Sequence, residues 1–494
     1  MLTAAYDIGT TAVKGVLMDD AGTVLSTYSE PVTTIFEGER KEQDPEEWWE
    51  QFCRISRRFI KESLDGRIHR IIMSGQMQDV IPVGENGKAV GRAILYSDGR
   101  GMDQAEKLCA ALGKDYLEQT TGNHFDGSLS VPKILWLKEN HPEVFEAARY
   151  FLISAKDYII FRLTGKAAGD VTACSTAGGM DIKQKQWDPQ ILKAAGILDS
   201  RMPQIYEPHK AVGLVTKEGA EAAGLSTDTT VYAGIGDAGA TTLASGIASP
   251  GEYNVNLGTS GWVATMSEKI SRTDGGIFNL ASFEKDLYIN VVPFLNAGNV
   301  HKWVSGILST KGEDGRIDYS FVERELDQSE VGSRGVAFLP YLNGERFPVM
   351  DTEVRGTFLG ISADTQKGDL ARSCLEGVAF SIRQGIESIG ILPRKITVIG
   401  GGGRVALWNQ ILADVLHQSV YVYKNAEILP ALALNSSVLL AEGKIAGYSD
   451  FTRLLQKEEF SVRYEPNPSN IALYDELYKK YLRIYPMVKA YYQA

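Results

Sequence analysis

Short apolar stretches alternate with glycine- and hydroxyl-rich turns from the first residues of the chain onward. Residues 3–6, 15–18 and 23–29 have the composition of β-strands, and the segments between them have turn chemistry. At Asp44-Pro45 the pattern changes, because Asp is a favoured N-cap and Pro is well tolerated at the first helical position. One face of the predicted helix carries Trp49, Phe52, Ser56, Phe59 and Ile60. Strands followed by an amphipathic helix are typical of an α/β fold.

The second half of the chain repeats the opening pattern. Residues 253–257 and 262–266 predict two strands around Gly258-Thr259-Ser260-Gly261. This predicted hairpin has the same pattern of strand, Gly-Thr bend and strand as the first one, which bends at Gly9-Thr10-Thr11. Two such hairpins, one opening each half, predict a duplicated α/β fold whose halves face each other across a cleft.

An acidic residue set among glycines and alanines lies near the midpoint of the 494-residue chain, in Gly234-Ile235-Gly236-Asp237-Ala238-Gly239. Residues 231–233 predict a short strand that leads into it, and glycines allow the backbone to approach a ligand closely. Asp237 is either a catalytic carboxylate or only the N-cap of a helix predicted over 238–247, and this stretch alone leaves both interpretations open. The helix is broken at 249–251, so we expect two domains, 1–246 and 247–494.

The first hairpin carries the donors of a phosphate site. Gly9, Thr10 and Thr11 offer backbone N–H groups and hydroxyls, as an anion-binding nest does. Lys14 adds positive charge nearby, and Asp7 could hold Mg²⁺ directly or through water. The alternative is an ordinary hairpin with a Gly-Thr-Thr turn.

Two polar loops follow predicted strands in the first half. Gln76 and Gln78 come after the strand at 68–73, where α/β folds place ligand contacts, and their amides suit hydroxyl groups. A simple polar hairpin loop is the alternative. In the second loop we expect Asp98 and Arg100 to pair with each other, since neighbouring opposite charges do so by default.

A run of four glycines at 400–403 joins a buried strand at 395–399 to a helix predicted over 406–417. Glycines leave room for a purine or a phosphate, and a helix N-terminus favours negative charge, so this turn indicates a nucleotide site. It matches neither the dinucleotide pattern GxGxxG nor the P-loop pattern GxxxxGK[ST]. A tight packing turn is the alternative.

Composition narrows the function classes. Net charge is −11, which argues against broad binding to nucleic acids or anionic membranes. The four cysteines are scattered without a CxxC pair, so we expect neither a zinc site nor a disulfide framework, and a cytoplasmic location. The N-terminus has no basic segment of a signal peptide, and no apolar run reaches the length of a membrane span.

Taken together, eight motifs resemble the FGGY family of carbohydrate kinases, within the sugar kinase, Hsp70 and actin superfamily. They occur in family order over nearly the whole chain, and they are most similar to the xylulokinase branch. The motifs are Asp7-Ile8-Gly9-Thr10-Thr11, Gly75-Gln76-Met77, Ile94-Leu95-Tyr96-Ser97-Asp98-Gly99-Arg100, Pro132-Lys133-Ile134-Leu135-Trp136-Leu137, Gly236-Asp237, Leu257-Gly258-Thr259-Ser260-Gly261, Leu339-Pro340-Tyr341-Leu342-Asn343-Gly344-Glu345-Arg346 and Gly400-Gly401-Gly402-Gly403-Arg404.

The resemblance implies two actin-like (ribonuclease H-like) domains with a catalytic cleft between them, a sugar on the N-terminal domain and Mg-ATP against the C-terminal one. It implies that Asp237 is the general base. Further implied roles are sugar contacts from Met77, Gln78 and the Asn123–Ser128 loop, Mg²⁺ near Asp7, and ATP contacts from Thr11, Lys14, Gly258, Thr259, Gly298, Gly401 and Gly402.

The chain departs from the xylulokinase pattern beside the sugar: Gln78-Asp79 stands where that branch has His-Gly. The expected reaction is ATP-dependent phosphorylation of a ketopentose such as D-xylulose. Gluconate, ribulose, glycerol or another polyol is the alternative acceptor. An actin- or Hsp70-like ATPase and a non-catalytic sugar-binding regulator are alternatives of another class. The expected partners are a small sugar and ATP, without nucleic acid or membrane, and a homodimer stays open.

Overall fold

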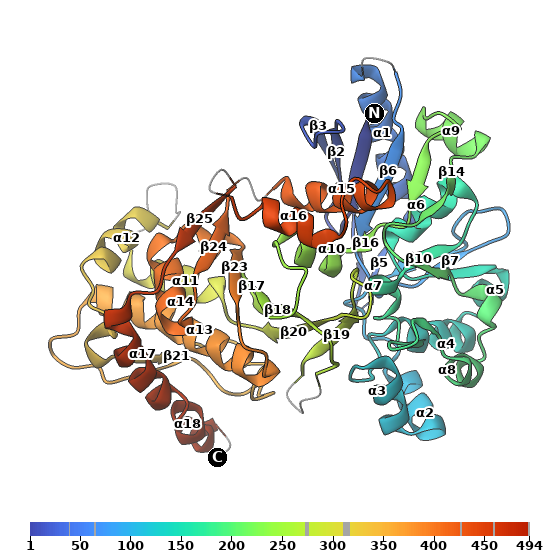
Figure 1. The fold of residues 1–494 in the computed structure, drawn as a ribbon. Helices are drawn as coiled ribbons and strands as arrows, with labels where there is room; N and C mark the ends of the chain where they lie inside the picture. Colours follow the sequence, from blue (N-terminus) through green and yellow to red (C-terminus); the bar gives the residue numbers. More distant parts are fainter. Residues whose placement is uncertain are drawn as a thin grey trace. The chain divides into compact units, whose positions relative to one another are not determined.

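The computed structural model describes residues 1–38, 40–63, 66–271, 276–309, 317–424, 427–457 and 460–492. The chain forms two compact units. Unit 1 contains Met1–Ala244, Asn279–Tyr288 and Glu427–Phe451, and unit 2 contains Ser245–Phe278, Ile289–Ala426 and Thr452–Ala494. Each unit is a mixed α/β structure (Figure 1). Each has its own hydrophobic core.

The central sheet of unit 1 has the order β14-β15-β6-β1-β2-β3, with β16 also paired to β6. Its first three strands are the predicted hairpin and return strand: β1 and β2 pair antiparallel, as do β2 and β3. β6 then adds parallel to β1, and β15 adds parallel to β6. The strands are β1 (Thr3–Ile8), β2 (Ala12–Met18), β3 (Val24–Pro31), β6 (Arg70–Gly75), β14 (Ala211–Leu214), β15 (Thr230–Tyr232) and β16 (Ile235–Gly236).

The sheet of unit 2 repeats this plan, in the order β20-β18-β17-β23-β24-β25. β17 and β18 form the second hairpin, β23 adds parallel to β17, and β24 adds parallel to β23. The same sequence of antiparallel and parallel pairings in both units confirms the predicted duplication. The strands are β17 (Glu252–Leu257), β18 (Gly261–Ser267), β20 (Tyr288–Phe294), β23 (Lys395–Ile399), β24 (Val420–Tyr423) and β25 (Ser461–Tyr464).

Helix α1 (Pro45–Glu62) shows how the sequence produces the layers of unit 1. The carboxylate of Asp44 caps it, accepting a hydrogen bond from the N–H of Glu46 at 2.9 Å. Trp48, Phe52 and Phe59 are fully buried in the same core as the strands, and α1 contacts β2 and β3. In unit 2, helix α13 (Lys367–Ile389) packs on α11, α12, α14 and β21.

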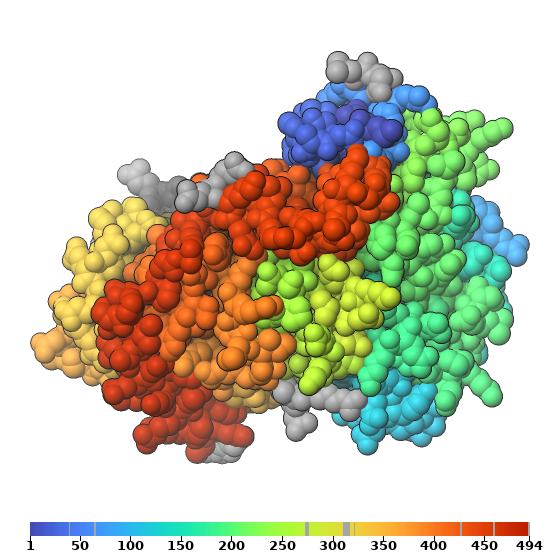
Figure 2. Space-filling view, in the orientation of Figure 1, coloured from blue at the N-terminus to red at the C-terminus, as the bar shows by residue number. Residues whose placement is uncertain are grey.

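The segment 427–451 belongs to unit 1 although it is distant in sequence from the rest of that unit. Its helix α15 (Leu429–Ala441) contacts β1, β6 and α10. Arg70 donates a hydrogen bond to Glu442 at 2.9 Å, and Lys444 contacts Asp20 at 3.2 Å. In Figure 2 this orange-red segment lies beside the blue surface of the first strands.

The remaining elements connect or cover the two sheets. In unit 1 they are β4 (Ile35–Glu37), β5 (Arg40–Gln43), β7 (Ile81–Val83), β8 (Ala93–Ile94), β9 (Tyr150–Leu152), β10 (Ala168–Asp170), β11 (Met180–Asp181), β12 (Gln186–Trp187), β13 (Gln204–Tyr206), α2 (Met102–Leu112), α3 (Lys114–Thr121), α4 (Ser130–Asn140), α5 (Pro142–Ala147), α6 (Ala155–Thr164), α7 (Val171–Cys174), α8 (Pro189–Ala195), the 3₁₀ helix η1 (Asp199–Arg201), α9 (Lys217–Ala223) and α10 (Asp237–Ala244). In unit 2 they are α11 (Gly298–Leu308), α12 (Tyr319–Asp327), η2 (Ser333–Gly335), β21 (Ala337–Leu339), β22 (Thr357–Leu359), η3 (Gly401–Arg404), α14 (Ala406–Leu416), α17 (Pro468–Tyr481) and α18 (Ile484–Tyr492). Two further elements are β19 (Phe278–Ala281) and α16 (Tyr448–Leu454), and both cross a unit boundary in the sequence, as does β20 at Tyr288.

Candidate active site

The turn before Asp237 is fixed against the central strand of unit 1. Strand β16 pairs with β6 at Ser74 and Gly75. Gly234 has φ +71°, and a Cβ there would lie 1.9 Å from the carbonyl oxygen of Met73, so only glycine fits. The helix begins at Asp237 and ends at Ala244, earlier than the predicted 247. Oδ1 of Asp237 accepts a hydrogen bond from the N–H of Ala238 at 2.7 Å.

The electrostatic environment of Asp237 suits proton transfer near neutral pH. Burial among protein atoms raises the pKa of Asp237 to about 7, and the negative charge of Asp7 adds to the shift. The side chain nevertheless keeps a solvent-exposed surface. The raised pKa therefore reflects the density of protein around the carboxyl group and the nearby acid, rather than complete enclosure. A carboxyl group with this pKa is matched to work as a general base at pH 7.

Asp7 lies on β1, directly opposite Lys14 on β2. Its Oδ1 accepts a hydrogen bond from the hydroxyl of Ser74 at 2.9 Å. Burial raises the pKa of Asp7, while the Ser74 hydrogen bond and the charge of Lys14 oppose that shift. Thr11 and Lys14 are exposed, so both can reach a ligand in solvent.

The loop that carries Met77 and Gln78, the two predicted sugar contacts, lies beside the turn before Asp237. We call it the sugar loop. A Cβ on Gly236 would lie 2.1 Å from the sulfur of Met77, so the Met77 side chain packs directly on the backbone before Asp237. Gln78 adopts φ +63°, and its Nε2 donates a hydrogen bond to the hydroxyl of Ser128 at 2.9 Å. The structure thus brings together the turn, Met77 and the loop that ends at Ser128.

The structure favours the polar-loop alternative for Gln76, and it places the amide of Asn123 in a contact within unit 1. Gln76 is buried, and its amide bonds to Thr10 at 2.7 Å and Gln43 at 2.8 Å, so this amide supports the loop instead of meeting a ligand. Asn123 is also engaged within unit 1: its amide exchanges hydrogen bonds of 2.7 and 2.8 Å with the backbone of Asn279.

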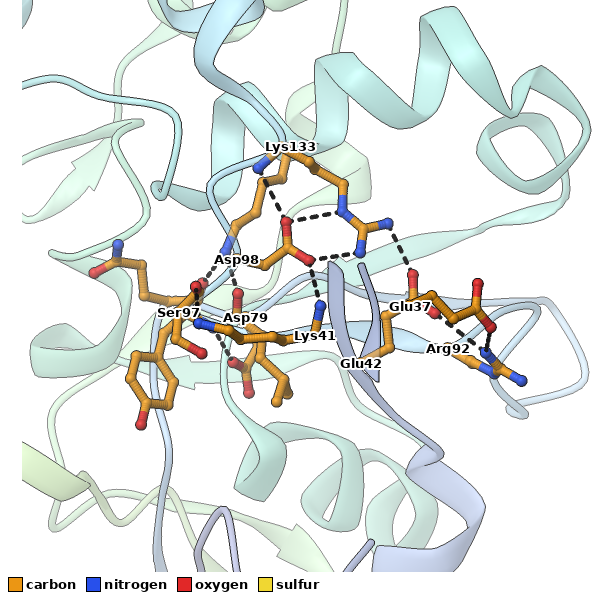
Figure 3. A network of polar contacts seen from close by, with 12 residues as sticks. Glu37, Lys41, Glu42, Asp79, Arg92, Ser97, Asp98 and Lys133 are labelled. Carbon is orange, nitrogen blue, oxygen red and sulfur yellow. Dashed lines mark hydrogen bonds and ion pairs between the residues drawn. The ribbon is translucent and has the colours of Figure 1, made fainter. Parts of the chain in front are cut away.

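Figure 3 shows a polar network that includes Lys41, Glu42 and Asp98. The expected ion pair between Asp98 and Arg100 is part of this network. Arg100 contacts Asp98 at 2.6 Å and also reaches Glu42 at 2.8 Å. The same Asp98 carboxylate accepts the backbone N–H of Lys41 at 2.7 Å. Because these contacts engage both of its oxygens, the Asp98 carboxylate joins the segments at Lys41 and Arg100.

The predicted nucleotide residues of unit 2 converge. The N–H of Gly298 donates to the carbonyl oxygen of Gly258 at 2.7 Å, and the N–H of Asn299 donates to that of Thr259 at 3.0 Å. A Cβ on Gly298 would lie 2.5 Å from the oxygen of Gly258, so the α11 N-terminus and the second hairpin bend touch backbone to backbone. Thr259 is exposed at this place.

The glycine run lies against the same bend. Gly400 has φ +89°, and a Cβ there would lie 2.8 Å from the nitrogen of Gly258. Gly402 is buried, with Leu257 and Trp408 closer than 3.0 Å to its hypothetical Cβ. Gly401 is exposed, and a Cβ on it would meet no described atom within 4 Å. Close packing therefore explains why glycine is required at positions 400 and 402. It does not explain Gly401, which borders open space.

Within the described residues, no cluster of three or more His, Cys, Asp and Glu side chains could hold a metal ion. Mg²⁺ keeps most of its water and needs only one or two carboxylates together with substrate phosphates. The single carboxylate of Asp7, beside the exposed Thr11, fits that requirement.

Among the helices of the described ranges, none is long and apolar enough to cross a bilayer.

Sequence reasoning missed two residues that support Asp237. Asp170 accepts the N–H of Gly236 at 3.2 Å, and Lys156 contacts Asp170 at 2.9 Å. Both side chains are completely buried. The available signal was the Lys156-Asp157 pair, which directly precedes the largely apolar segment 158–163.

Two protein-family models match the chain. The model of the FGGY family of carbohydrate kinases, N-terminal domain, matches residues 2–244, and the C-terminal domain model matches residues 253–430. A xylulose kinase of Staphylococcus xylosus is 28% identical over 490 residues, which covers 97% of this chain and 98% of that protein. A gluconokinase of Bacillus subtilis (strain 168) is 29% identical over 462 residues, which covers 90% and 88%.

Two solved structures share the fold over the whole chain. A gluconate kinase and a ligand-bound xylulose kinase, both from Lactobacillus acidophilus, are each 27% identical with a TM-score of 0.88. Each alignment covers 100% of this chain and 99% of the other. These similarities confirm the predicted family resemblance and the two-domain fold, and relatives of two substrate classes lie at similar identity.

Proposed function

We propose, from the premise that this chain belongs to the FGGY family of carbohydrate kinases, that it phosphorylates a hydroxyl of a ketopentose such as D-xylulose, with Mg-ATP as donor. Sugar kinases of this family use ATP as the phosphate donor. Relatives named xylulose kinase support the ketopentose, and relatives named gluconokinase or gluconate kinase make an aldonate the second candidate.

The observation that carries the proposal is Asp237 at the start of α10, with Met77 on the adjacent backbone and a pKa of about 7. The Asp237 carboxylate takes the proton of the acceptor hydroxyl as that oxygen attacks the γ-phosphorus. The bond between the γ-phosphorus and the β–γ bridging oxygen breaks, and ADP leaves. Because a sugar hydroxyl is a poor nucleophile, removing this proton is the step that the side chain accelerates.

In this proposal the nucleotide-binding residues are Gly258, Thr259, Gly298, Gly401 and Gly402, together with Thr11 and Lys14. Their support is the convergence of the hairpin bend, the α11 N-terminus and the glycine run within unit 2. Backbone N–H groups at such bends suit phosphate oxygens. Asp7 would hold Mg²⁺, which supplies positive charge against the phosphates when bound.

Met77 and Gln78 are the proposed sugar contacts, since both are half-buried on the loop beside Asp237. Gln78-Asp79 stands in place of His-Gly, and this difference bears on which acceptor is bound, because hydrogen-bonding groups beside the sugar set its specificity. Residues 1–246 are the proposed sugar-binding region and residues 247–494 the ATP-binding region. A cytoplasmic location and a homodimer complete the proposal.

The test is ADP release, measured in a coupled assay across ketopentoses, aldonates and polyols. We expect one class to stimulate the rate strongly, and a rate indifferent to every acceptor would contradict a sugar kinase. Asp237→Asn should lower kcat by about 10²- to 10⁴-fold, the usual contribution of a general base. Sugar-dependent turnover that is unchanged in this variant would overturn the assignment of the base.

A further inference from the structure

A buried group of one lysine and two aspartates lies behind the candidate base in unit 1. Lys156 Nζ is 2.6 Å from Asp157 Oδ1 and 2.9 Å from Asp170 Oδ2, and all three side chains are 0% exposed. We call these three residues the Lys156 group. Burying charges is costly unless they are paired and hydrogen-bonded, so such a group persists only where its partners fix it. No step of the proposed reaction uses these side chains.

Asp170 of the Lys156 group binds the backbone next to Asp237. Oδ1 of Asp170 accepts a hydrogen bond from the N–H of Gly236 at 3.2 Å, and Gly236 immediately precedes Asp237. The same oxygen caps α7, accepting from Thr172 at 3.0 Å and from Ala173 at 3.3 Å. Asp170 therefore connects a rigid helix start to the backbone that presents Asp237.

Asp157 of the Lys156 group is connected to the sugar loop through Ser154. Oδ2 of Asp157 accepts the N–H of Ser154 at 3.1 Å, and the hydroxyl of Ser154 donates to the carbonyl oxygen of Gln76 at 2.7 Å. Gln76 immediately precedes Met77. A Cβ on Gly75 would lie 2.9 Å from the nitrogen of Lys156, so the loop and the start of α6 are in direct backbone contact.

We infer that Asp170 is a positioning residue for Asp237, and that Lys156 and Asp157 couple the base to the sugar loop through one buried network. The inference rests on the proposed function of Asp237. Its physical basis is that a base must lie within hydrogen-bond reach of the hydroxyl it deprotonates. A misplacement of about 1 Å can cost 10²-fold in rate. Fixing both segments to one buried ammonium holds their separation constant.

The test is Asp170→Ser, with sugar phosphorylation measured under the same assay conditions. Serine is itself a favoured N-cap, so α7 keeps a cap, but the shorter side chain loses the contacts with Lys156 and Gly236. We expect kcat to fall about 10- to 100-fold while the KM for ATP stays within about twofold. An unchanged kcat would overturn the inference.

A double-mutant cycle separates positioning from general damage. If Asp170 acts through Asp237, Asp170→Ser should lower kcat in the wild-type background but cause no further loss in the Asp237→Asn background. Equal losses in both backgrounds would contradict positioning. A near-wild-type Asp237→Asn enzyme would instead contradict the proposed base, so the two failures are distinguishable.

Asp188 provides a matched control. It caps α8 in the same way, accepting from Gln190 at 2.9 Å and Ile191 at 2.8 Å, and its second oxygen accepts the hydroxyl of Tyr116 at 2.9 Å. Asp188→Ser should therefore lose similar contacts without changing kcat.

If Asp170→Ser does not fold, Asp157→Ser decides the question at the other end of the network. Loss of the bond to Ser154 should raise the sugar KM at least about fivefold with a smaller effect on kcat, because the sugar loop and not the base is released. An unchanged sugar KM would overturn the coupling.

Discussion

Lys133 and Lys156 are both completely buried in unit 1, yet their partners differ. Lys156 contacts the carboxylates of Asp157 and Asp170. Lys133 instead donates to the backbone carbonyl oxygens of Gln78 at 2.8 Å and Leu95 at 2.9 Å. Burial lowers the pKa of both lysines, but the two aspartates reverse the effect at Lys156 and raise its pKa. At Lys133 burial prevails, and the pKa falls to about 8.

The difference shows what makes a buried cation stable. Direct carboxylate contacts offset the loss of hydration, whereas neutral carbonyl dipoles offset only part of it. The negative charge of Asp79 opposes the fall in the pKa of Lys133. One Asp79 oxygen accepts the N–H of Tyr96 at 3.0 Å, and the other has no hydrogen-bond partner in the described part of the chain. Burial raises the pKa of Asp79 well above its usual range.

Both lysines nevertheless serve the same loop. The Lys156 group reaches the carbonyl oxygen of Gln76 through Ser154, and Lys133 binds that of Gln78 directly. The left-handed conformation of Gln78 is unusual for a residue with a side chain, so the contact with Lys133 helps to hold it. The sugar loop is thus anchored on both sides of Met77.

The largest expected effect comes from Lys156→Met. Removing the ammonium leaves Asp157 and Asp170 buried without a counter-ion, so we expect unfolding to become easier by about 3–5 kcal/mol. Urea denaturation at pH 7 measures this loss. A loss below about 1 kcal/mol would show that the carboxylates do not depend on Lys156.

Lys133→Met should have a smaller effect. It leaves the carbonyl oxygens of Gln78 and Leu95 unpaired but creates no uncompensated carboxylate contact, so we expect a loss of about 2–3 kcal/mol. Lys138, exposed on the same helix, gives the control Lys138→Met, which should stay within about 0.5 kcal/mol of wild type. If Lys133→Met cost as much as Lys156→Met, the contrast between carbonyl and carboxylate partners would be wrong.

The smallest effect is a difference in pH dependence. Between about pH 8 and 10.5 the folded protein binds less proton at Lys133 than the unfolded chain does, so its contribution to stability rises with pH. The slope is at most about 1.4 kcal/mol per pH unit. Lys156 has the opposite sign, because its raised pKa makes its contribution fall above pH 10.5.

At each pH, thermal melts give the free energy of unfolding of wild type and of Lys133→Met. The difference between the two isolates the contribution of Lys133 from that of other titrating groups. We expect the stability difference to grow between pH 8 and 10. A difference that stays constant or shrinks over this range would mean that Lys133 keeps its proton in the folded state.

Much of the candidate site follows from local sequence. The bends at Gly9-Thr10-Thr11 and Gly258-Thr259, the Asp44 cap and the Asp98–Arg100 pair were all predicted, and the structure confirms these local features. The position of Asp237 after a strand and at a helix start was predicted as well. Its role as the base stays a prediction.

The roles of other residues depend on partners that lie far along the chain. For Gln76 the sequence left a ligand contact and a polar hairpin loop both open, and the structure shows that Thr10 and Gln43 occupy its amide. Lys156 and Asp170 were not selected, since nothing near them in sequence indicates that they meet behind Gly236.

The sequence by itself determined the strands, the turns, the caps and the duplicated order of the hairpins, because these depend on neighbours within a few residues. Only the tertiary structure decided which polar side chains are buried, what compensates each one, and which loops they hold. Lys133 and Lys156 both lie in largely apolar helical segments, yet one meets carbonyl oxygens and the other carboxylates. The cost of burying a charge depends on partners that only the fold brings within 3 Å.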